Sequence, residues 1–224
     1  MMQNFKVIEK NNLTKDVYEI VFEWEKLLEM LPWQFVTFIL DKIWWRAYSI
    51  LELKWKKIVL IIKKWELDNW WRWGSKFICN LKIWDIIKWV WPAWHFLLKE
   101  TEKNKLFIWT WTWLVPLYNQ IILALEKWLN SKLKLIFWVR TINDLFYIKQ
   151  FEELKNQNSN FDFEIYLSRD KDTKYNSWYV TDFLNKENTQ DFEEFYICWA
   201  PGMIDSATEI LEKNWKTEIY FEKY

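Results

Sequence analysis

Glycine is almost missing from this chain, which has 2 glycines in 224 residues. A globular protein of this length averages about 16. As printed, the sequence therefore lacks the glycine-rich turns that let a backbone approach a phosphate group closely. Tryptophan shows the opposite bias, with 21 residues. The two biases occur together, and several tryptophans stand at positions where glycine is the favoured residue.

Cysteine and histidine are also scarce, because Cys79, Cys198 and His95 are the only residues of these types. Two distant cysteines and one histidine cannot build a zinc site or hold an iron–sulfur cluster, so we expect no metal site. The first residues lack the apolar segment of a signal peptide. This predicts a cytoplasmic protein without a disulfide bond.

The chain has no excess of charge of either sign, since Lys plus Arg and Asp plus Glu both number 31. This balance argues against a nucleic acid as partner. The longest apolar stretch, residues 106–125, is interrupted by Pro116, Asn119 and Gln120. We therefore expect no membrane span there.

Four tryptophans stand at turns or helix ends that favour a positive φ angle. Trp33 follows a proline, and Trp84 precedes an aspartate between two apolar segments. Trp128 and Trp215 each follow a segment with helical periodicity, where a left-handed residue commonly ends the helix. Each bulky residue held in a left-handed conformation costs about 1–2 kcal/mol.

We hypothesise that the gene uses UGA for glycine, as some bacterial lineages do, and that UGA was read as tryptophan. Ordinary UGG codons would contradict this.

The pattern of the chain changes near residue 100. Before it, short segments rich in β-branched and aromatic residues predict an antiparallel barrel or sandwich with one short helix from about Ser75. After it, alternating strand-like and helix-like segments predict a parallel sheet with helices on its faces. The polar residues 98–104 would join a first domain, residues 1–100, to a second, residues 101–224. The expected strands are 5–9, 17–23, 35–40, 47–53, 58–63, 86–90, 105–108, 133–139, 161–167, 194–198 and 218–221, and the expected later helices are 117–127, 141–156, 179–184 and 203–213.

Three segments carry the chemistry. The sequence Arg46-Ala47-Tyr48-Ser49 begins a strand, and residues 106–116 form a strand, a turn that alternates threonine with tryptophan, and a helix start. The third segment, residues 196–203, contains Cys198, Pro201 and Met203. With glycine at the tryptophan positions, these segments resemble in this order the ferredoxin–NADP reductase family. The resemblance covers nearly the whole chain. It implies an antiparallel β-barrel domain that binds FAD, followed by an α/β parallel-sheet domain that binds NADP, with NAD as an alternative.

In the first domain the resemblance assigns the FAD site to one strand and one helix start. Arg46 would pair with the FAD diphosphate, which suits a guanidinium group. Tyr48 would pack on the isoalloxazine and Ser49 would bond near flavin N5, so both also count as catalytic residues. The helix start would place N–H groups on the FAD phosphates, although Ser75 can also be read as an ordinary helix cap. The remaining residues assigned to FAD are Lys63, Trp73, Gly74 and Ser75.

In the second domain the resemblance assigns the nicotinamide coenzyme to the loops that follow the strands. Thr110 and Thr112, with glycine at the alternating positions, would line the diphosphate, whereas indoles there would fill its space. Ser168 and Arg169 would bind the 2′-phosphate of NADP, with Lys174 and Tyr175 as further candidates, or would form a solvated loop. The other residues assigned to this coenzyme are Trp109, Trp111, Trp113, Arg140, Trp199, Pro201 and Met203.

The resemblance also assigns residues to the hydride transfer. Cys198 would lie beside nicotinamide C4, and the terminal Glu222 and Tyr224 would lie near the nicotinamide and over the flavin. Without the resemblance, Cys198 reads as a buried cysteine, and the last residues read as a frayed terminus.

The prediction is a flavoprotein oxidoreductase that transfers hydride between NAD(P)H and FAD and exchanges single electrons with ferredoxin or flavodoxin. The electron acceptor would be a separate protein or a small molecule, because the chain lacks the ferredoxin cysteine spacing. One alternative is an NAD(P)H–flavin reductase or the electron-transfer subunit of a larger oxidoreductase. The other is a cofactor-free, tryptophan-rich binding protein, which would be colourless.

Overall fold

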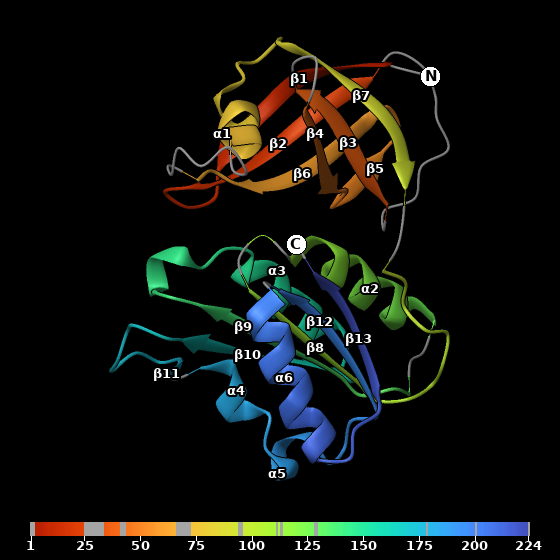
Figure 1. The fold of residues 1–224 in the computed structure, drawn as a ribbon, viewed down its shortest axis with the longest axis vertical. Helices are drawn as coiled ribbons and strands as arrows, with labels where there is room; N and C mark the ends of the chain where they lie inside the picture. The colour runs from red at the N-terminus through yellow and green to blue at the C-terminus, as the bar shows by residue number, and fades with distance from the viewer. Residues whose placement is uncertain are drawn as a thin grey trace. The chain divides into compact units, whose positions relative to one another are not determined.

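The computed structural model describes residues 3–24, 34–40, 44–65, 73–93, 96–110, 112, 114–127, 130–177, 179–199 and 201–223. The predictions for Trp33, Trp111, Trp113, Trp128 and Tyr224 lie outside these residues. The chain divides into two compact units, Met1–His95 and Phe96–Tyr224, which Figure 1 shows in warm and cool colours.

The first unit is a seven-stranded antiparallel sheet with the strand order β4-β3-β7-β1-β2-β6-β5. Alternate residues of the strands point into one core that contains Phe5, Phe22, Phe38 and Leu60. The predicted antiparallel first domain is confirmed. The elements are β1 (Gln3–Asn12), β2 (Val17–Trp24), β3 (Phe35–Leu40), β4 (Trp44–Ser49), β5 (Glu52–Lys54), β6 (Lys57–Lys63), α1 (Trp73–Asn80) and β7 (Ile86–Ala93).

The single strand predicted over 47–53 is wrong, because β4 and β5 are separate strands. Two buried residues between them, Ile50 and Leu51, change the pairing partner of the chain. The Ile50 amide donates to the Gln34 carbonyl beside β3 at 2.9 Å, whereas the Leu51 amide donates to Val59 of β6 at 2.9 Å. The bend thus lets one segment pair first with β3 and then with β6.

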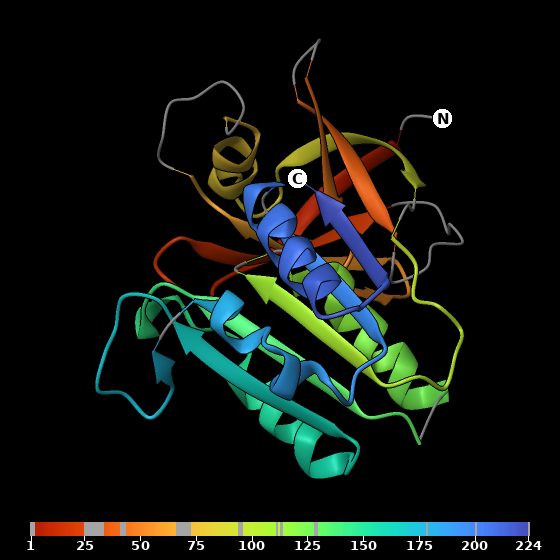
Figure 2. The ribbon, with the colours of Figure 1, turned by 60° about the horizontal axis from the view of Figure 1, so that its bottom comes forward.

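The second unit is a six-stranded parallel sheet with the order β11-β10-β9-β8-β12-β13, as predicted. Figure 2 shows α6 across one face of this sheet, and its buried residues pack with Leu106 and Ile108. Phe151 of α3 packs on the opposite face, with its ring 5.1 Å from the Trp109 ring. The elements are β8 (Lys105–Thr110), α2 (Leu114–Lys127), β9 (Leu133–Val139), η3 (Ile142–Asp144), α3 (Ile148–Gln157), β10 (Phe161–Leu167), β11 (Asn176–Ser177), α4 (Val180–Phe183), α5 (Lys186–Thr189), β12 (Glu194–Trp199), α6 (Pro201–Lys213) and β13 (Glu218–Lys223).

The helix predicted over 141–156 is interrupted. Both the amide and the hydroxyl of Thr141 donate to Asp144 Oδ2 at 2.9 Å. These bonds cap a one-turn 3₁₀ helix, which ends before α3 begins. Tyr147 then adopts a left-handed conformation with φ 62° before α3 starts. A capping carboxylate inside the apparent helix therefore divides it.

Five non-glycine residues of the described chain have positive φ angles, and three of them are tryptophans. Trp84 has φ 80° and Trp215 has φ 60°, which confirms the positive angles predicted for both. At the end of α6 the Trp215 amide donates to Glu212 at 2.9 Å and the Lys216 amide donates to Leu211 at 3.0 Å. This is the Schellman motif, whose left-handed residue is usually glycine.

Trp55 is the third such tryptophan and was not predicted. It has φ 52° and is the first residue of the two-residue loop that joins β5 to β6. A type II′ hairpin turn favours glycine at this position. Its side chain is 80% exposed, so no packing holds the indole there.

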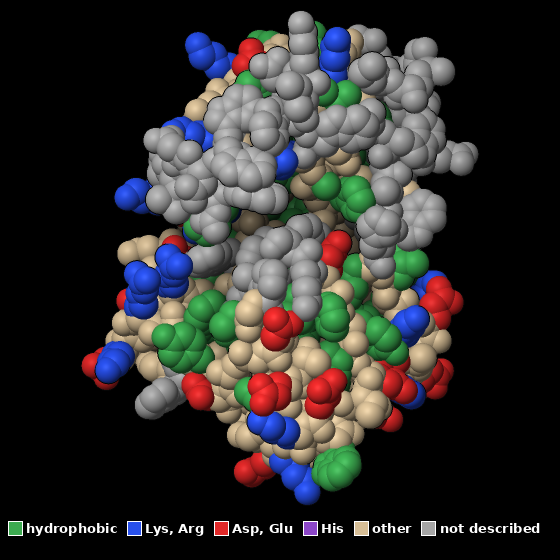
Figure 3. Space-filling model, in the orientation of Figure 1, with side chains coloured by type: hydrophobic (Ala, Val, Ile, Leu, Met, Phe, Trp, Pro, Cys, Tyr) green, Lys and Arg blue, Asp and Glu red, His purple; other side chains and the backbone are tan. Residues whose placement is uncertain are grey.

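Charges of both signs are interspersed on the face of the second unit shown in Figure 3, in keeping with the balanced composition. Within the parts of the chain that the structure covers, no helix is long and apolar enough to cross a membrane.

Candidate functional site

The sheet of the second unit has a topological switch point at β8. The chain goes from β8 to β9 on one side, and β12 later pairs with β8 on the other side. Loops that leave the carboxyl ends of two such strands diverge and open a crevice between them, which is where ligands bind in open parallel sheets. The predicted coenzyme loop, between Thr110 and Leu114, follows β8 at this point.

Three predicted residues lie side by side at this carboxyl edge. Cys198 of β12 is the register partner of Trp109 in β8 and of Glu222 in β13. We call Trp109, Cys198 and Glu222 the carboxyl-edge row. Because register partners point to the same face of a sheet, the three side chains share one face. The structure thus brings together residues that are far apart in the sequence.

Cys198 is a buried, neutral thiol. Its side chain is inaccessible, and burial, with a smaller contribution from the negative charge of Glu222, raises its pKa well above the usual value. Cys79 in α1 is also buried, and burial raises its pKa to about 12. A protonated thiol can pack against a flat ring, but it is a poor nucleophile.

We therefore expect neither cysteine to react with iodoacetamide in the folded protein at about pH 8, because both thiols are buried and burial raises both pKa values above that of a free cysteine. Peptide mass spectrometry after a timed exposure would measure the labelling. Both cysteines should be labelled in denaturant, which serves as the control. Rapid native labelling of Cys198 but not Cys79 would show that the carboxyl edge opens in solution.

Trp109 and Thr110, the last two residues of β8, are both buried. The Trp109 indole is fully buried and packs in the core with its ring 4.4 Å from the Phe137 ring. Thr110 is also buried, and its hydroxyl donates to the Trp138 carbonyl at 2.6 Å. Thr110 therefore bonds to the neighbouring strand through its hydroxyl, and its place along the coenzyme diphosphate stays a prediction. Its position as the last residue of β8 still places its backbone at the edge.

The Trp109 indole N–H has no hydrogen-bond partner, and the same is true of Trp24 and Trp89 in the first unit. A buried tryptophan usually finds a partner for this group, and an unpaired buried donor costs about 1–3 kcal/mol. These three rings therefore fill space without the polar contact that a native tryptophan normally makes.

Two arginines lie on neighbouring loops at the same carboxyl edge. The Arg169 amide donates to the Arg140 carbonyl at 2.9 Å, and the Ser168 amide donates to Val139 at 3.1 Å. Asp170 Oδ2 accepts from the Ile142 amide at 2.7 Å, which fixes the two loops to each other. Both arginine side chains are exposed. The predicted residues Arg140, Ser168 and Arg169 thus form one cationic corner.

The segment after β12 starts the helix that was predicted to lie beneath the coenzyme. Trp199 ends β12 and Pro201 begins α6, where proline suits the first helical position. Gly202 has open space around its Cα, and Met203 packs partly buried against the α6 core.

The predicted FAD residues of the first unit occupy β4, β6 and α1. Tyr48 lies half-buried with its ring 6.0 Å from the Phe38 ring. Burial raises its pKa, Cys79 of α1 adds to this, and Arg46 opposes it. Ser49 follows on the opposite face of β4.

The described residues of α1 and β4 fit a diphosphate, and Lys63, the basic residue predicted for the FAD site, forms an ion pair within the first unit. Gly74 and Ser75 lie in the first turn of α1, where backbone N–H groups are open to an anion, and Arg46 supplies a cation. Trp73 also starts α1, but its side chain is outside the described part. Lys63 is buried, and its Nζ lies 2.7 Å from Asp16 Oδ2, so its charge is already compensated.

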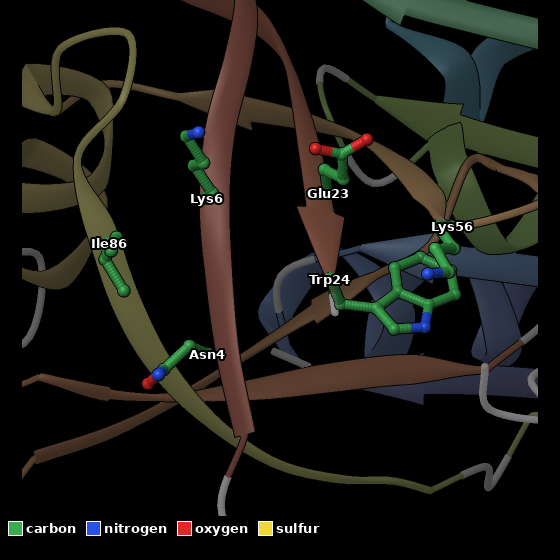
Figure 4. Close-up of a pocket in the computed structure, with 6 residues that line it drawn as sticks. All are labelled: Asn4, Lys6, Glu23, Trp24, Lys56 and Ile86. Carbon is green, nitrogen blue, oxygen red and sulfur yellow. The ribbon is translucent and has the colours of Figure 1, made fainter. Parts of the chain in front are cut away.

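One cavity of about 410 Å³ lies on the first unit, and Figure 4 shows its lining side chains. They come from β1, β2, β7 and the β5–β6 turn, and none was predicted to bind a cofactor. The cavity is therefore separate from the predicted sites. Its lining residues are Asn4, Lys6, Glu23, Trp24, Lys56 and Ile86.

Residues 114–209 match the family model of the oxidoreductase NAD-binding domain. The matched segment is less than half of the chain. It contains α2, the cationic corner and Cys198, whereas the other two residues of the carboxyl-edge row, Trp109 and Glu222, lie outside it.

The chain is also similar to whole proteins. It is 28% identical over 148 residues to a subunit of the Na(+)-translocating NADH-quinone reductase of Marinomonas sp. strain MWYL1, a match that covers 62% of this chain and 36% of that protein. The chain thus spans little more than a third of the length of such relatives.

Solved structures show the two-domain fold. A ferredoxin NADP+ reductase from Neisseria gonorrhoeae with bound FAD and NADP superposes with a TM-score of 0.84 at 15% identity, covering 99% of this chain and 98% of that one. The FAD/NAD-binding domain of a Vibrio cholerae nitric oxide dioxygenase gives a TM-score of 0.83 at 15% identity, with coverage of 99% and 98%. The predicted fold class, an antiparallel sheet domain followed by a parallel-sheet domain, is confirmed.

Proposed function

We propose that the chain is an FAD-dependent NAD(P)H oxidoreductase module that moves hydride between the nicotinamide and the flavin. The observation that supports this most is the carboxyl-edge row, where Cys198 lies between Trp109 and Glu222 at the switch point of an NAD-binding domain. When bound, FAD would supply the hydride acceptor and one-electron chemistry. The chain itself would orient the two rings and exclude water between them.

Each predicted group has a role that its chemistry allows. The neutral Cys198 thiol and the half-buried Glu222 would border the nicotinamide. The α2 start would take the coenzyme diphosphate, because helix N-termini attract anions. Arg46 and the first turn of α1 would take the FAD diphosphate. Tyr48, Ser49 and Tyr224 would contact the flavin ring.

For the electron partner, we propose a separate ferredoxin or flavodoxin, or a neighbouring subunit of a larger oxidoreductase. The similarity to one subunit of an NADH-quinone reductase favours the second candidate and NADH as the coenzyme. The exposed Arg169 beside Arg140 favours NADPH, because a guanidinium pair suits a 2′-phosphate. A cytoplasmic location remains a prediction.

We also propose that most tryptophans of the printed sequence are glycines in the natural protein. Three tryptophans with positive φ and three with unpaired buried N–H groups support this. Glycine removes both problems, because it has neither a Cβ nor an indole. UGA codons at these positions in the gene would support the proposal, and UGG codons would contradict it.

The function can be tested by stopped-flow reduction of the FAD-loaded protein, prepared with glycine at positions 109, 111 and 113. Bleaching of the flavin absorbance by NADPH or NADH is the expected result.

An Arg169→Ala variant should bind NADPH with a free energy weaker by about 1.5–3 kcal/mol, the contribution of a hydrogen bond to a charged group, and should bind NADH unchanged. Unchanged coenzyme preference would remove Arg169 from the site. A colourless protein that takes up no FAD would favour the cofactor-free alternative.

A further inference from the structure

The segment 96–104 carries the chain from the first unit into β8, and hydrogen bonds hold it against the second unit along its length. The Phe96 carbonyl accepts from Gln120 Nε2 of α2 at 3.0 Å. The Lys99 amide donates to the Tyr196 hydroxyl at 3.0 Å. The Asn104 amide donates to Glu193 Oε2 at 3.0 Å. This segment, which we call the linker, therefore has a fixed path across the second unit.

A buried ion pair holds the end of the linker. Lys105 and Glu194 are register partners at the amino ends of β8 and β12, and the Lys105 Nζ lies 3.6 Å from Glu194 Oε2. Both side chains are inaccessible, at 0% and 1% exposure. Removing two charges from water is costly, so such a pair persists only when further hydrogen bonds satisfy its remaining donors and acceptors.

Those further hydrogen bonds come from the linker. The Lys105 Nζ donates to the Thr101 carbonyl at 2.7 Å and to the Lys103 carbonyl at 2.8 Å. The Thr101 hydroxyl donates to Glu194 Oε1. The ion pair and the linker path therefore depend on each other, because a displaced linker would remove hydrogen bonds that satisfy the two buried charges.

Tyr196 connects this cluster to the carboxyl-edge row. Its hydroxyl donates to Glu194 Oε2 at 2.7 Å and accepts the Lys99 amide. Its ring lies 5.2 Å from the rings of Phe107 and Tyr220. Alternation along β12 places Glu194, Tyr196 and Cys198 on one face, so the tyrosine lies between the buried ion pair and the row.

We propose that Tyr196 is a positioning residue: with Glu194 it anchors the linker at a fixed place relative to the carboxyl-edge row, and the linker in turn guides the FAD unit. This inference rests on the proposed hydride transfer. Hydride transfer requires close alignment, and a displacement of about 1 Å can slow a reaction roughly a hundredfold. A fixed linker reduces the range of positions that the attached unit can sample.

The test uses the full chain with glycine at positions 109, 111 and 113, in which Tyr196→Phe removes one hydroxyl and keeps the ring packing. Hydrogen exchange of the amides in 97–104 should become faster. Flavin reduction by saturating NAD(P)H should slow by about tenfold or more, while the dissociation constant of the coenzyme stays the same. Glu194→Gln is less suitable, because it leaves the buried Lys105 charge uncompensated.

Tyr166→Phe is the matched control. The Tyr166 hydroxyl donates to Glu164 Oε2 at 3.0 Å, with the same two-residue spacing along a strand, but β10 makes no hydrogen bond to the linker among those described. Removing this hydroxyl should change neither the hydrogen exchange of residues 97–104 nor the rate of flavin reduction.

Unchanged hydrogen exchange in Tyr196→Phe would show that Tyr196 does not anchor the linker. Faster exchange with an unchanged rate of flavin reduction would overturn the positioning role. If even the unsubstituted protein fails to reduce flavin, the proposed function fails, and the positioning role with it, whereas the exchange readout still reports on the anchor.

Discussion

Replacing Trp55, Trp84 and Trp215 together by glycine should raise the free energy of unfolding by roughly 2 kcal/mol. Relief of a left-handed bulky residue gives about 1–2 kcal/mol per site, and the greater freedom of glycine in the unfolded chain takes back about 0.5–1 kcal/mol per site. The three indoles are 80%, 63% and 87% exposed, so little burial is lost. Guanidinium unfolding curves measure the change.

Alanine at the same three positions is the matched control. It removes the indole and keeps the Cβ that causes the strain, so the alanine protein should gain little. The gain in stability should be smallest at Trp84, because its substitution also removes a contact with Lys6. The Lys6 Nζ lies 4.2 Å from the centre of the Trp84 ring, and such a contact contributes about 0.5–1 kcal/mol at an exposed site. Equal stability of the glycine and alanine proteins would show that the backbone angles carry no strain.

Glycine at 109, 111 and 113 should produce the largest functional change. We expect the glycine form to bind NAD(P)H with a dissociation constant near 1 μM, about −8 kcal/mol, and the printed form to bind none at about 1 mM. Only three residues join Thr110, the last of β8, to Leu114, the first of α2. A diphosphate at the helix start therefore has to meet this short backbone closely. Isothermal titration calorimetry measures both constants.

Two further variants show whether the change in coenzyme binding comes from the loop between β8 and α2. Trp215→Gly makes the same chemical change at the end of α6, away from the loop, and should leave nucleotide binding unaltered. Glycine at 111 and 113 alone keeps Trp109 in its core position between Phe137 and Phe151, so it tests the loop without opening a cavity. Tight coenzyme binding by the printed form would show that indoles in this loop are compatible with the site.

The sequence was sufficient for the two-domain fold and for most strands, because alternation and segment length decide these locally. It also located the left-handed residues Trp84 and Trp215, since helix ends and turns have local signals. The expected strands 47–53 and 58–63 left residues 54–57 as a connection, but they did not show that Trp55 has a positive φ. That angle follows from the register of β5 with β6, which makes Trp55 the first residue of a two-residue turn.

The sequence named candidate residues of the site, but it did not show which of them contact each other. The motifs named Cys198 and Glu222 separately, and only the strand register shows that they are neighbours. Lys63 was assigned by resemblance, but its partner Asp16 is distant in sequence. The anchor was missed altogether, because Lys105 and Glu194 each look like an ordinary charged residue before an apolar strand. Whether the individual site residues bind the cofactors remains a prediction.

The strand order around β8 has a consequence for how the protein assembles. β9 and β10 follow β8 closely in the chain, whereas β12, its other neighbour, comes only after α3, α4 and α5. Pairing with β12 thus closes a much longer loop and carries a larger entropic cost. A chain folded only as far as β10 leaves one side of β8 with unpaired N–H and C=O groups. Strands of other chains can pair with such an edge, which favours aggregation. Pairing of β12, the strand that supplies Cys198, therefore covers the side of β8 that is open in a partly folded chain.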